Sequence, residues 1–202
     1  MKARTLMAIS LLASGFCNPG DVVQLGEVSA EKTWVYLCGL AETVNVEQEV
    51  ENRQLLDQLG KKHHIRFLAI HPFERCEKAN NKLCWIHYTD EQTLETYENI
   101  EEVVGKEKIA GFIGFSNGGF FLNKLAQMKE LEVPLVSIGA SSSFNPAPSS
   151  NEITLIVGRE EFVYESAQQF AQQAKGSPLS ITFIEHEGGH ILPAKVLENF
   201  IW

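Results

Sequence analysis

The sequence predicts an α/β fold, with a mainly parallel sheet and helices on both of its faces. Short apolar runs alternate with amphipathic segments along most of the 202 residues, and this alternation is typical of repeated strand–helix units. The runs are almost continuously apolar, which indicates strands that are buried on both faces. A chain of this length is expected to form one domain with a substantial core.

The first half of the chain is expected to hold two strands and two helices. The apolar runs TWVYLCG at residues 33–39 and IRFLAI at residues 65–70 predict the strands. Apolar side chains recur at helical spacing over 46–59 and 93–104, which predicts the helices. Residues 76–84, CEKANNKLC, form a polar stretch after the second strand, and we expect a loop there.

The second half of the chain repeats this rhythm more clearly. The connection over 140–151 is rich in Ser, Pro and Asn, and it is too short to hold a helical cap domain. Apolar runs predict strands, and helical periodicity predicts the helices between them. The strands are expected over 108–115, 134–139, 153–158 and 179–185, and the helices over 117–128, 163–174 and 194–201.

The composition excludes several classes of partner. Apolar residues make up 44% and charged residues 21% of the chain, which is typical of a folded globular protein. The net charge of −9 argues against binding to nucleic acid, since phosphate recognition needs a basic surface. No apolar run approaches the roughly 20 residues of a membrane-spanning helix, so no stable insertion into a membrane is expected.

The N-terminus has the layout of a short secretory signal. Lys2 and Arg4 precede a mostly apolar stretch over 6–16, and the small residues at 13–15 suit a cleavage site. We therefore expect residues 1–15 to be a signal peptide and the mature protein to be periplasmic or secreted. The alternative is a native apolar segment that packs on the core of a cytoplasmic protein.

The four cysteines of the chain bear on the same question. Cys76 and Cys84 flank the polar stretch, and they are expected to form a disulfide if the protein is exported and to stay reduced otherwise. No C-x-x-C pair is present, so a four-cysteine zinc site is not supported. Cys38 lies within an apolar run and is expected to be a small core residue.

The segment GFSNGG, at residues 114–119, carries a candidate nucleophile. It is a G-x-S-x-G motif between an expected strand and an expected helix. In that context the glycines permit a tight turn that presents the hydroxyl of Ser116 beyond the end of the sheet. A phosphate-binding loop is the alternative, but the chain contains neither G-x-x-x-x-G-K nor G-x-G-x-x-G.

The segment HEGGH, at residues 186–190, matches the H-E-x-x-H motif of zinc peptidases. That zinc site requires a helix, because only then do both histidines share one face. Two central glycines each cost a helix about 1 kcal/mol relative to alanine, and Pro193 disrupts its continuation. The segment also follows directly on a strand-like run. We therefore expect a loop without a metal, in which His190, rather than His186, reaches Ser116.

A candidate acid lies between these two motifs. Glu160 and Glu161 follow the strand expected over 153–158. In open α/β sheets, functional residues lie beyond the carboxyl ends of the strands. The resulting chain order of Ser, acid and His is the order of an α/β-hydrolase triad and differs from the orders in other serine hydrolases.

With the motifs GFSNGG, IVGREEF and HEGGHIL, the chain over 22–202 resembles small serine hydrolases of the α/β-hydrolase superfamily. Within that superfamily it is similar to dienelactone hydrolases and phospholipase/carboxylesterase-like esterases. The resemblance implies a single α/β-hydrolase domain in which Ser116 is the nucleophile, His190 the general base and Glu161 the acid. Family members usually have Asp at the acid position, and this departure leaves Glu160 open as the alternative acid.

The resemblance also implies an oxyanion hole made by two backbone N–H groups, those of Asn117 and Leu40. Relatives often carry His-Gly before the second of these positions, whereas this chain has Cys38-Gly39. A backbone N–H makes the contact, so the change of side chain need not abolish activity.

The implied function is a serine esterase that hydrolyses small carboxylic esters, with thioesters and lysolipids as further candidates, through an acyl-enzyme. Its partner is a small-molecule ester, and neither a cofactor nor a metal is implied. The alternative is a hydrolase-fold binding protein that has lost turnover. The Glu in place of Asp and the missing His-Gly motivate that alternative, since function depends on the site and not on the fold.

Overall fold

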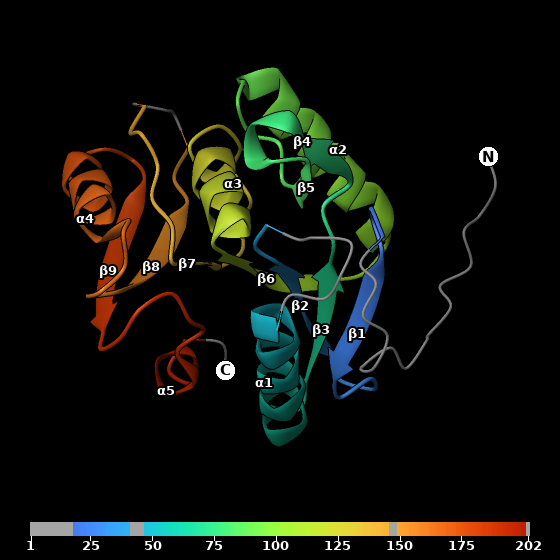
Figure 1. Cartoon of the computed structure of the whole chain (residues 1–202). Helices are drawn as coiled ribbons and strands as arrows, with labels where there is room; N and C mark the ends of the chain where they lie inside the picture. The colour runs from blue at the N-terminus through green and yellow to red at the C-terminus, as the bar shows by residue number, and fades with distance from the viewer. Residues whose placement is uncertain (1–17, 41–46, 146–148, 201–202) are drawn as a thin grey trace.

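Figure 1 shows the computed structural model of the chain, which describes residues 18–40, 47–145 and 149–200. Seven strands form one sheet in the order β1-β3-β2-β6-β7-β8-β9. Neighbouring strands run parallel, except that the edge strand β1 pairs with β3 in antiparallel fashion. The strands are β1 (Val22–Gly26), β2 (Lys32–Leu37), β3 (Ile65–Ile70), β6 (Ile109–Phe115), β7 (Leu135–Ile138), β8 (Glu152–Gly158) and β9 (Ser180–His186).

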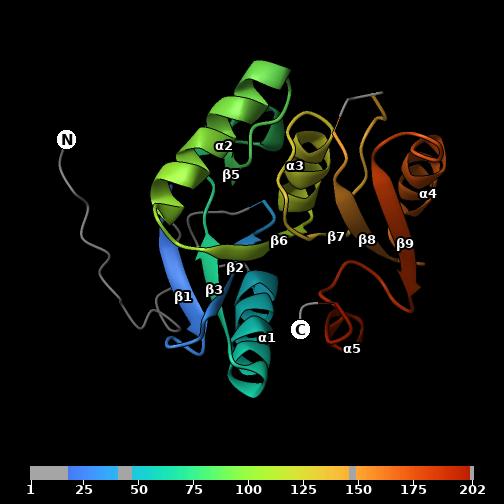
Figure 2. The same ribbon diagram turned by 180° about the vertical axis from the view of Figure 1, so that it is seen from behind.

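The helices cover both faces of this sheet, as Figure 1 and the opposite view in Figure 2 show. On one face lie α2 (Asp90–Val104), α3 (Asn117–Ala126) and α4 (Tyr164–Gln173). On the other face lie α1 (Glu47–His63) and the short α5 (Ala194–Leu197). The result is a three-layer arrangement with the sheet in the middle.

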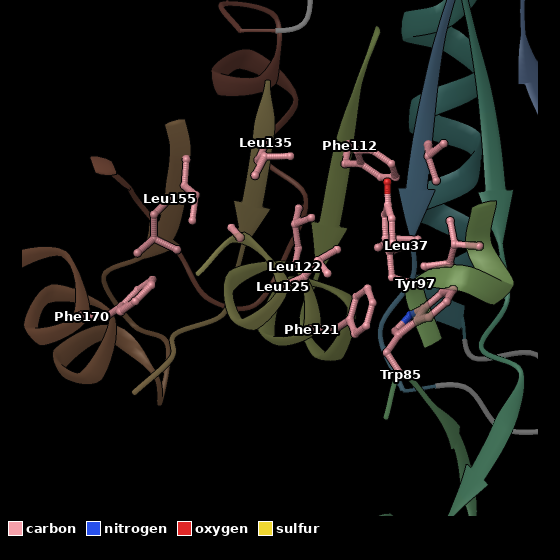
Figure 3. Close-up of a cluster of buried hydrophobic side chains, with 14 of the residues drawn as sticks. Leu37, Trp85, Tyr97, Phe112, Phe121, Leu122, Leu125, Leu135, Leu155 and Phe170 are labelled. Atoms are coloured by element: carbon pink, nitrogen blue, oxygen red, sulfur yellow. The ribbon is translucent and has the colours of Figure 1, made fainter. Parts of the chain in front are cut away.

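Each face of the sheet has its own apolar core. Along β2, Val35 and Leu37 contribute to the core beneath α2, α3 and α4, whereas Trp34 and Tyr36 contribute to the core beneath α1. This alternation follows from the two-residue period of a strand and explains why the run is apolar at every position. Figure 3 shows the first core, in which Phe121 and other helix residues meet side chains from the sheet.

The strand–helix order predicted from the sequence is confirmed. Each expected strand is present within two residues of its expected bounds. Helix α1 is longer than expected and ends at His63 rather than at residue 59, and the expected α5 over 194–201 ends at Leu197. Residues 46 and 201, where two of the predicted helices begin and end, lie outside the described residues.

The prediction missed two features. The edge strand β1 covers only five residues, VVQLG, which is too short for its pattern to stand out. The polar stretch 76–84 is not a loop throughout, because β4 (Glu74–Cys76) and β5 (Lys82–Cys84) pair as an antiparallel hairpin around a 3₁₀ turn, η1 (Glu77–Ala79). Its side chains are mostly polar because most of the hairpin faces away from the core.

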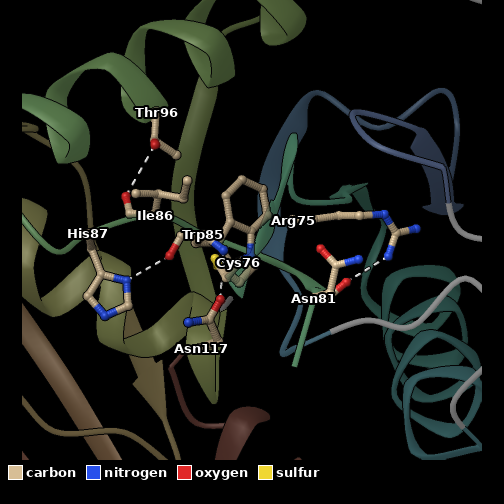
Figure 4. Close-up of a disulfide and its surroundings, with 9 residues drawn as sticks. Arg75, Cys76, Asn81, Trp85, Ile86, His87, Thr96 and Asn117 are labelled. Atoms are coloured by element: carbon tan, nitrogen blue, oxygen red, sulfur yellow. Dashed lines mark hydrogen bonds between the residues drawn. A yellow bond between two sulfur atoms is a disulfide. The ribbon is translucent and has the colours of Figure 1, made fainter. Parts of the chain in front are cut away.

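A disulfide joins the two strands of this hairpin. Cys76 and Cys84 are bonded, with their Cα atoms 5.9 Å apart, and both residues are buried. Figure 4 shows that the bond lies next to Trp85, the residue that leads the chain back towards α2. The disulfide therefore fixes the segment from which Trp85 enters the core.

The expected signal peptide, residues 1–15, lies outside the described residues, as does Cys17. No helix in the described part of the chain is both long enough and apolar enough to cross a membrane. Between β7 and β8, the residues that the structure describes form neither helix nor strand.

Replacing both hairpin cysteines, Cys76→Ser with Cys84→Ser, is expected to lower the free energy of unfolding by about 2 to 3 kcal/mol, because the unfolded chain regains the entropy of a short closed loop. Urea denaturation of the oxidised proteins measures this difference. Addition of a reductant should destabilise the wild type to the same extent and leave the double variant unchanged. Equal stability of the oxidised wild type and the double variant would contradict the prediction.

Candidate functional site

Ser116 occupies the turn between β6 and α3 in a strained backbone conformation. Its φ is 52° and its ψ is −117°, a region that residues with a side chain rarely adopt and that costs on the order of 1 to 3 kcal/mol. Strand β6 ends at Phe115 and helix α3 begins at Asn117, so the strain falls on this one residue. This is the strand–turn–helix geometry that presents a nucleophile at the carboxyl edge of a sheet.

The end of β2 packs directly against this turn. A Cβ atom on Gly118 would lie 2.2 Å from the backbone oxygen of Leu37, so only glycine fits there. The Gly118 N–H donates to the carbonyl oxygen of Cys38 over 3.1 Å. The indole N–H of Trp85 donates to the same oxygen over 2.8 Å. These contacts hold the turn after β2 beside Ser116.

The two predicted oxyanion-hole residues lie near the serine, one after β2 and one at the start of α3. Leu40 follows β2 and lines the same cavity as Ser116. Asn117 is the first residue of α3, where backbone N–H groups lack partners within the helix and the helix dipole favours negative charge. The side-chain oxygen of Asn117 accepts a hydrogen bond from the Trp85 backbone N–H over 2.7 Å, as Figure 4 shows.

The structure brings Glu161 into contact with His190. The imidazole Nδ1 of His190 lies 2.9 Å from Glu161 Oε2. The other carboxylate oxygen accepts the backbone N–H of Gly158 over 2.9 Å, and the Glu161 side chain is fully buried. Glu160, the alternative acid, is exposed to solvent. Of the two carboxylates that the sequence offered, Glu161 is the one that meets the histidine.

After its first residue, the HEGGH segment is a loop, as the sequence predicted. Strand β9 ends at His186, and the residues that follow it are not helical. The two histidines of the segment approach one carboxylate, because His186 Nε2 lies 3.8 Å from Glu161 Oε1. His186 is buried, and among the described residues its Nε2 has no hydrogen-bond partner. In the described part of the chain, no three His, Cys, Asp or Glu side chains are grouped so as to hold a metal.

The imidazole of His190 is held by its surroundings as well as by Glu161. Its ring lies 4.7 Å from the ring of Phe115 and 6.0 Å from that of Phe162, measured between centroids. The side-chain amide of Gln48 donates to the His190 backbone oxygen. Contacts from β6, α1 and the β8–α4 turn therefore fix the position of this loop residue.

Ser116 and His190 line one cavity of about 190 Å³. Its polar wall comes from α1 and was not predicted, because polar residues on a helix usually mark its solvent-exposed face. Glu49 and Asn52 are buried there. Besides Ser116, His190, Glu49 and Asn52, the cavity is lined by Gly39, Leu40, Gln48 and Phe115.

Burial shapes the titration of the groups behind this wall. It raises the pKa of Glu49, and the neighbouring Arg53 guanidinium opposes that shift. Burial, with a smaller contribution from the charge of Arg53, lowers the pKa of His71 to about 3, so His71 is neutral near pH 7. Burial and the charge of Glu49 raise the pKa of Tyr36 well above its ordinary value. The phenol therefore remains a hydrogen-bond donor.

Trp85 is not among the residues that line this cavity. Its side chain is fully buried and packs against Phe73 and Phe121. Its role at the site is indirect, through the hydrogen bonds to Cys38 and Asn117.

The model of a protein family described as serine hydrolase (FSH1) matches residues 30–199. The match includes Ser116, Glu161 and His190. No curated protein matches the sequence.

Solved structures of low sequence identity share the fold. The Bacillus cereus carboxylesterase is 13% identical, with a TM-score of 0.66 over 89% of this chain and 91% of that one. A SOBER1 variant from Arabidopsis thaliana is 14% identical, with a TM-score of 0.64 over 83% and 95%. A phospholipase/carboxylesterase from Dyadobacter fermentans is 14% identical, with a TM-score of 0.56 over 93% and 99%. The chain thus has the α/β-hydrolase fold that the sequence predicted.

The replacement Gly139→Ala is expected to break the hydrogen bond between His190 and Glu161. Gly139 has a φ of +60°, and a Cβ there would lie 2.8 Å from both Glu161 Oε2 and His190 Nδ1. The proton in the hydrogen bond between these two atoms is expected to give a downfield NMR resonance in the wild type, and this resonance should disappear in the variant.

Gly176→Ala is the matched control. Gly176 also has a positive φ, +85°, but a Cβ there would meet no atom within 4 Å. Both variants should lose about 1 to 2 kcal/mol of stability through backbone strain, while only the control keeps the resonance. A resonance that survives in Gly139→Ala would refute the predicted clash.

Proposed function

The chain belongs to the FSH1 serine hydrolase family, and from that premise we propose that it is an esterase that hydrolyses small carboxylic esters through an acyl-enzyme. The observation that carries the proposal is the hydrogen bond to the buried Glu161 from His190, which lines the same cavity as the strained Ser116. In the proposed triad, Ser116 is the nucleophile, His190 the general base and Glu161 the acid that orients the imidazole.

In the first half-reaction Ser116 Oγ attacks the carbonyl carbon of the ester, while His190 Nε2 takes the hydroxyl proton. Nδ1 of the same ring donates to Glu161, which leaves Nε2 as the basic nitrogen and stabilises the imidazolium that forms. The bond to the leaving alcohol then breaks, and His190 passes its proton to that alcohol. Water repeats the sequence on the acyl group and regenerates Ser116.

The backbone N–H groups of Leu40 and Asn117 stabilise the tetrahedral oxyanion in this mechanism. Loss of one such donor typically raises the barrier by roughly 3 kcal/mol. Leu40 follows Cys38, whose carbonyl oxygen accepts hydrogen bonds from Gly118 and Trp85, and the Asn117 side chain accepts a hydrogen bond from the Trp85 backbone. Their positions are therefore set before the substrate binds, which is what electrostatic stabilisation of a transition state requires.

Two observations support esters as the substrates. The folds of a carboxylesterase and a phospholipase/carboxylesterase are similar to that of this chain. The cavity, of about 190 Å³, is small beside the 300 to 1,000 Å³ of typical ligand pockets and suits a short acyl group. Thioesters and lysolipids present a comparable acyl carbon and belong to the same proposal.

Two sequence features had motivated the alternative of a binding protein without turnover. The first was Glu in place of Asp, yet Glu161 reaches His190 with ordinary hydrogen-bond geometry. The second was the missing His-Gly, yet the backbone oxygen of Cys38 still holds the turn beside Ser116 by accepting the Gly118 N–H. The structure gives no observation that favours the alternative.

Treatment with a fluorophosphonate probe is expected to label Ser116 and to abolish ester turnover, because the probe reacts only with an activated serine. Ser116→Ala should show neither labelling nor turnover of 4-nitrophenyl acetate. Mass spectrometry of the adduct identifies the labelled residue. Labelling at another serine, or equal turnover in the wild type and the variant, would rule out the proposed nucleophile.

Glu161→Gln is expected to lower kcat by about 10³- to 10⁴-fold, because the amide no longer holds the imidazole in the required tautomer. The matched control is Glu160→Gln, which makes the same chemical change at the exposed neighbour and should stay close to wild type. Circular dichroism confirms folding of both variants. If Glu160→Gln were the more damaging change, the acid would have to be reassigned.

A further inference from the structure

The cavity beside Ser116 has one strongly polar wall, and this wall belongs to α1. Glu49 and Asn52 are buried residues that nevertheless line the cavity. They lie one helical turn apart, so both side chains point to the same side of the helix. The proposed mechanism uses neither of them.

Hydrogen bonds hold both side chains in place. The Tyr36 hydroxyl donates to Glu49 Oε2 over 3.0 Å, and Arg53 Nε donates to Glu49 Oε1 over 3.1 Å. The Asn52 amide donates to the Tyr36 oxygen over 3.2 Å. Tyr36 comes from β2, the strand that leads to Leu40. The wall is therefore rigidly connected to the segment that contains the proposed oxyanion donor.

The wall presents hydrogen-bond acceptors rather than an uncompensated charge. Arg53 pairs with Glu49 and balances its carboxylate. Arg53 also approaches His71, with 2.5 Å between Nη2 and the imidazole Nε2. A guanidinium can only donate, so His71 accepts this bond in its neutral form and adds no positive charge.

Both residues line the cavity and keep acceptor positions that the described residues do not fill. A carboxylate has about four acceptor positions; Tyr36 and Arg53 donate to Glu49 at two of them, and Asn52 is a further side-chain hydrogen-bond partner. The amide oxygen of Asn52 accepts no hydrogen bond from the residues that the structure describes. A ligand that covers these acceptors without donating a hydrogen bond removes their contact with water, and this costs free energy. An alkyl group that fills this cavity carries that cost, whereas a hydroxyl group donates a hydrogen bond and avoids it.

We propose that Glu49 and Asn52 make the site selective for esters that carry a neutral hydrogen-bond donor, such as a hydroxyl group, on the part that enters this cavity. The inference rests on the proposed esterase function and names its substrate class, hydroxy-substituted short esters. Sites built to hydrogen-bond a substrate hydroxyl discriminate strongly against the analogue that lacks it.

Two matched pairs of esters test the proposal. The first is 4-nitrophenyl 3-hydroxybutyrate against 4-nitrophenyl butyrate, with the hydroxyl on the acyl side. The second is 2-hydroxyethyl butyrate against propyl butyrate, with the hydroxyl on the alcohol side and turnover followed by proton release. In at least one pair, kcat/KM is expected to be about tenfold or more higher for the hydroxy ester. The pair that shows the preference identifies which side of the ester occupies the cavity.

Variants assign the preference to the wall. Asn52→Leu and Glu49→Gln should each reduce the ratio of the two kcat/KM values by about fivefold or more, with Asn52→Leu bringing it close to one. The ratio compares two substrates on the same preparation, so it is independent of how much of a variant is folded. The control is Glu51→Gln, an exposed position on the same helix, which should leave the ratio unchanged.

The outcomes separate this inference from the function on which it rests. Turnover that depends on Ser116 but shows no preference in either pair overturns the selectivity and leaves the esterase intact. A preference that survives in both Asn52→Leu and Glu49→Gln shows that other residues select the substrate. Absence of Ser116-dependent turnover on all four esters overturns the esterase and the selectivity together.

Discussion

The close approach of β2 to the turn at Ser116 is the constraint on which the site depends. The Cys38 carbonyl oxygen accepts hydrogen bonds from Gly118 and from the indole of Trp85, so one backbone atom joins the end of β2, the turn at Ser116 and the residue that follows the disulfide hairpin. The strained backbone of Ser116 persists because contacts on both sides over-determine it. A hairpin that is distant in sequence thereby becomes part of the support of the serine.

Helix α1 is attached to the sheet by polar as well as apolar contacts. Leu56 and Leu59 pack on the sheet, while Glu49, Asn52 and Arg53 form a hydrogen-bonded group with Tyr36 nearer the cavity. Buried polar groups are costly unless each is satisfied, so an all-apolar face would be the simpler solution for packing alone. Two members of this group, Glu49 and Asn52, line the cavity, which indicates a role towards what the cavity binds.

The sequence predicted the site better than it predicted the walls around the site. The motif at 114–119, the carboxylates after β8 and the HEGGH loop all follow strands, and parallel strands bring their carboxyl ends to one edge. The buried group on α1 could not be found in the same way, because a Glu or Asn on a helix is ordinarily a solvent-exposed residue. The buried Tyr36, which the sheet places beside α1, gives these side chains a hydrogen-bond partner in the interior. Similarly, the local sequence of β1, VVQLG, does not predict that this strand pairs with β3.

The geometry of the HEGGH segment gives its two histidines different capacities. A carbonyl oxygen can only accept, so the contact of 3.0 Å between His186 Nδ1 and the Glu187 oxygen places the proton of the neutral ring on Nδ1. His186 Nε2 then faces Glu161 Oε1 as a bare lone pair at 3.8 Å and cannot donate to it. Among the described residues, this leaves His190 and the Gly158 N–H as the donors to that carboxylate. The HEGGH segment resembles a pair of metal ligands, but its two histidines differ. Glu161 can orient His190, whereas His186 cannot donate a hydrogen bond to Glu161 while its ring is neutral.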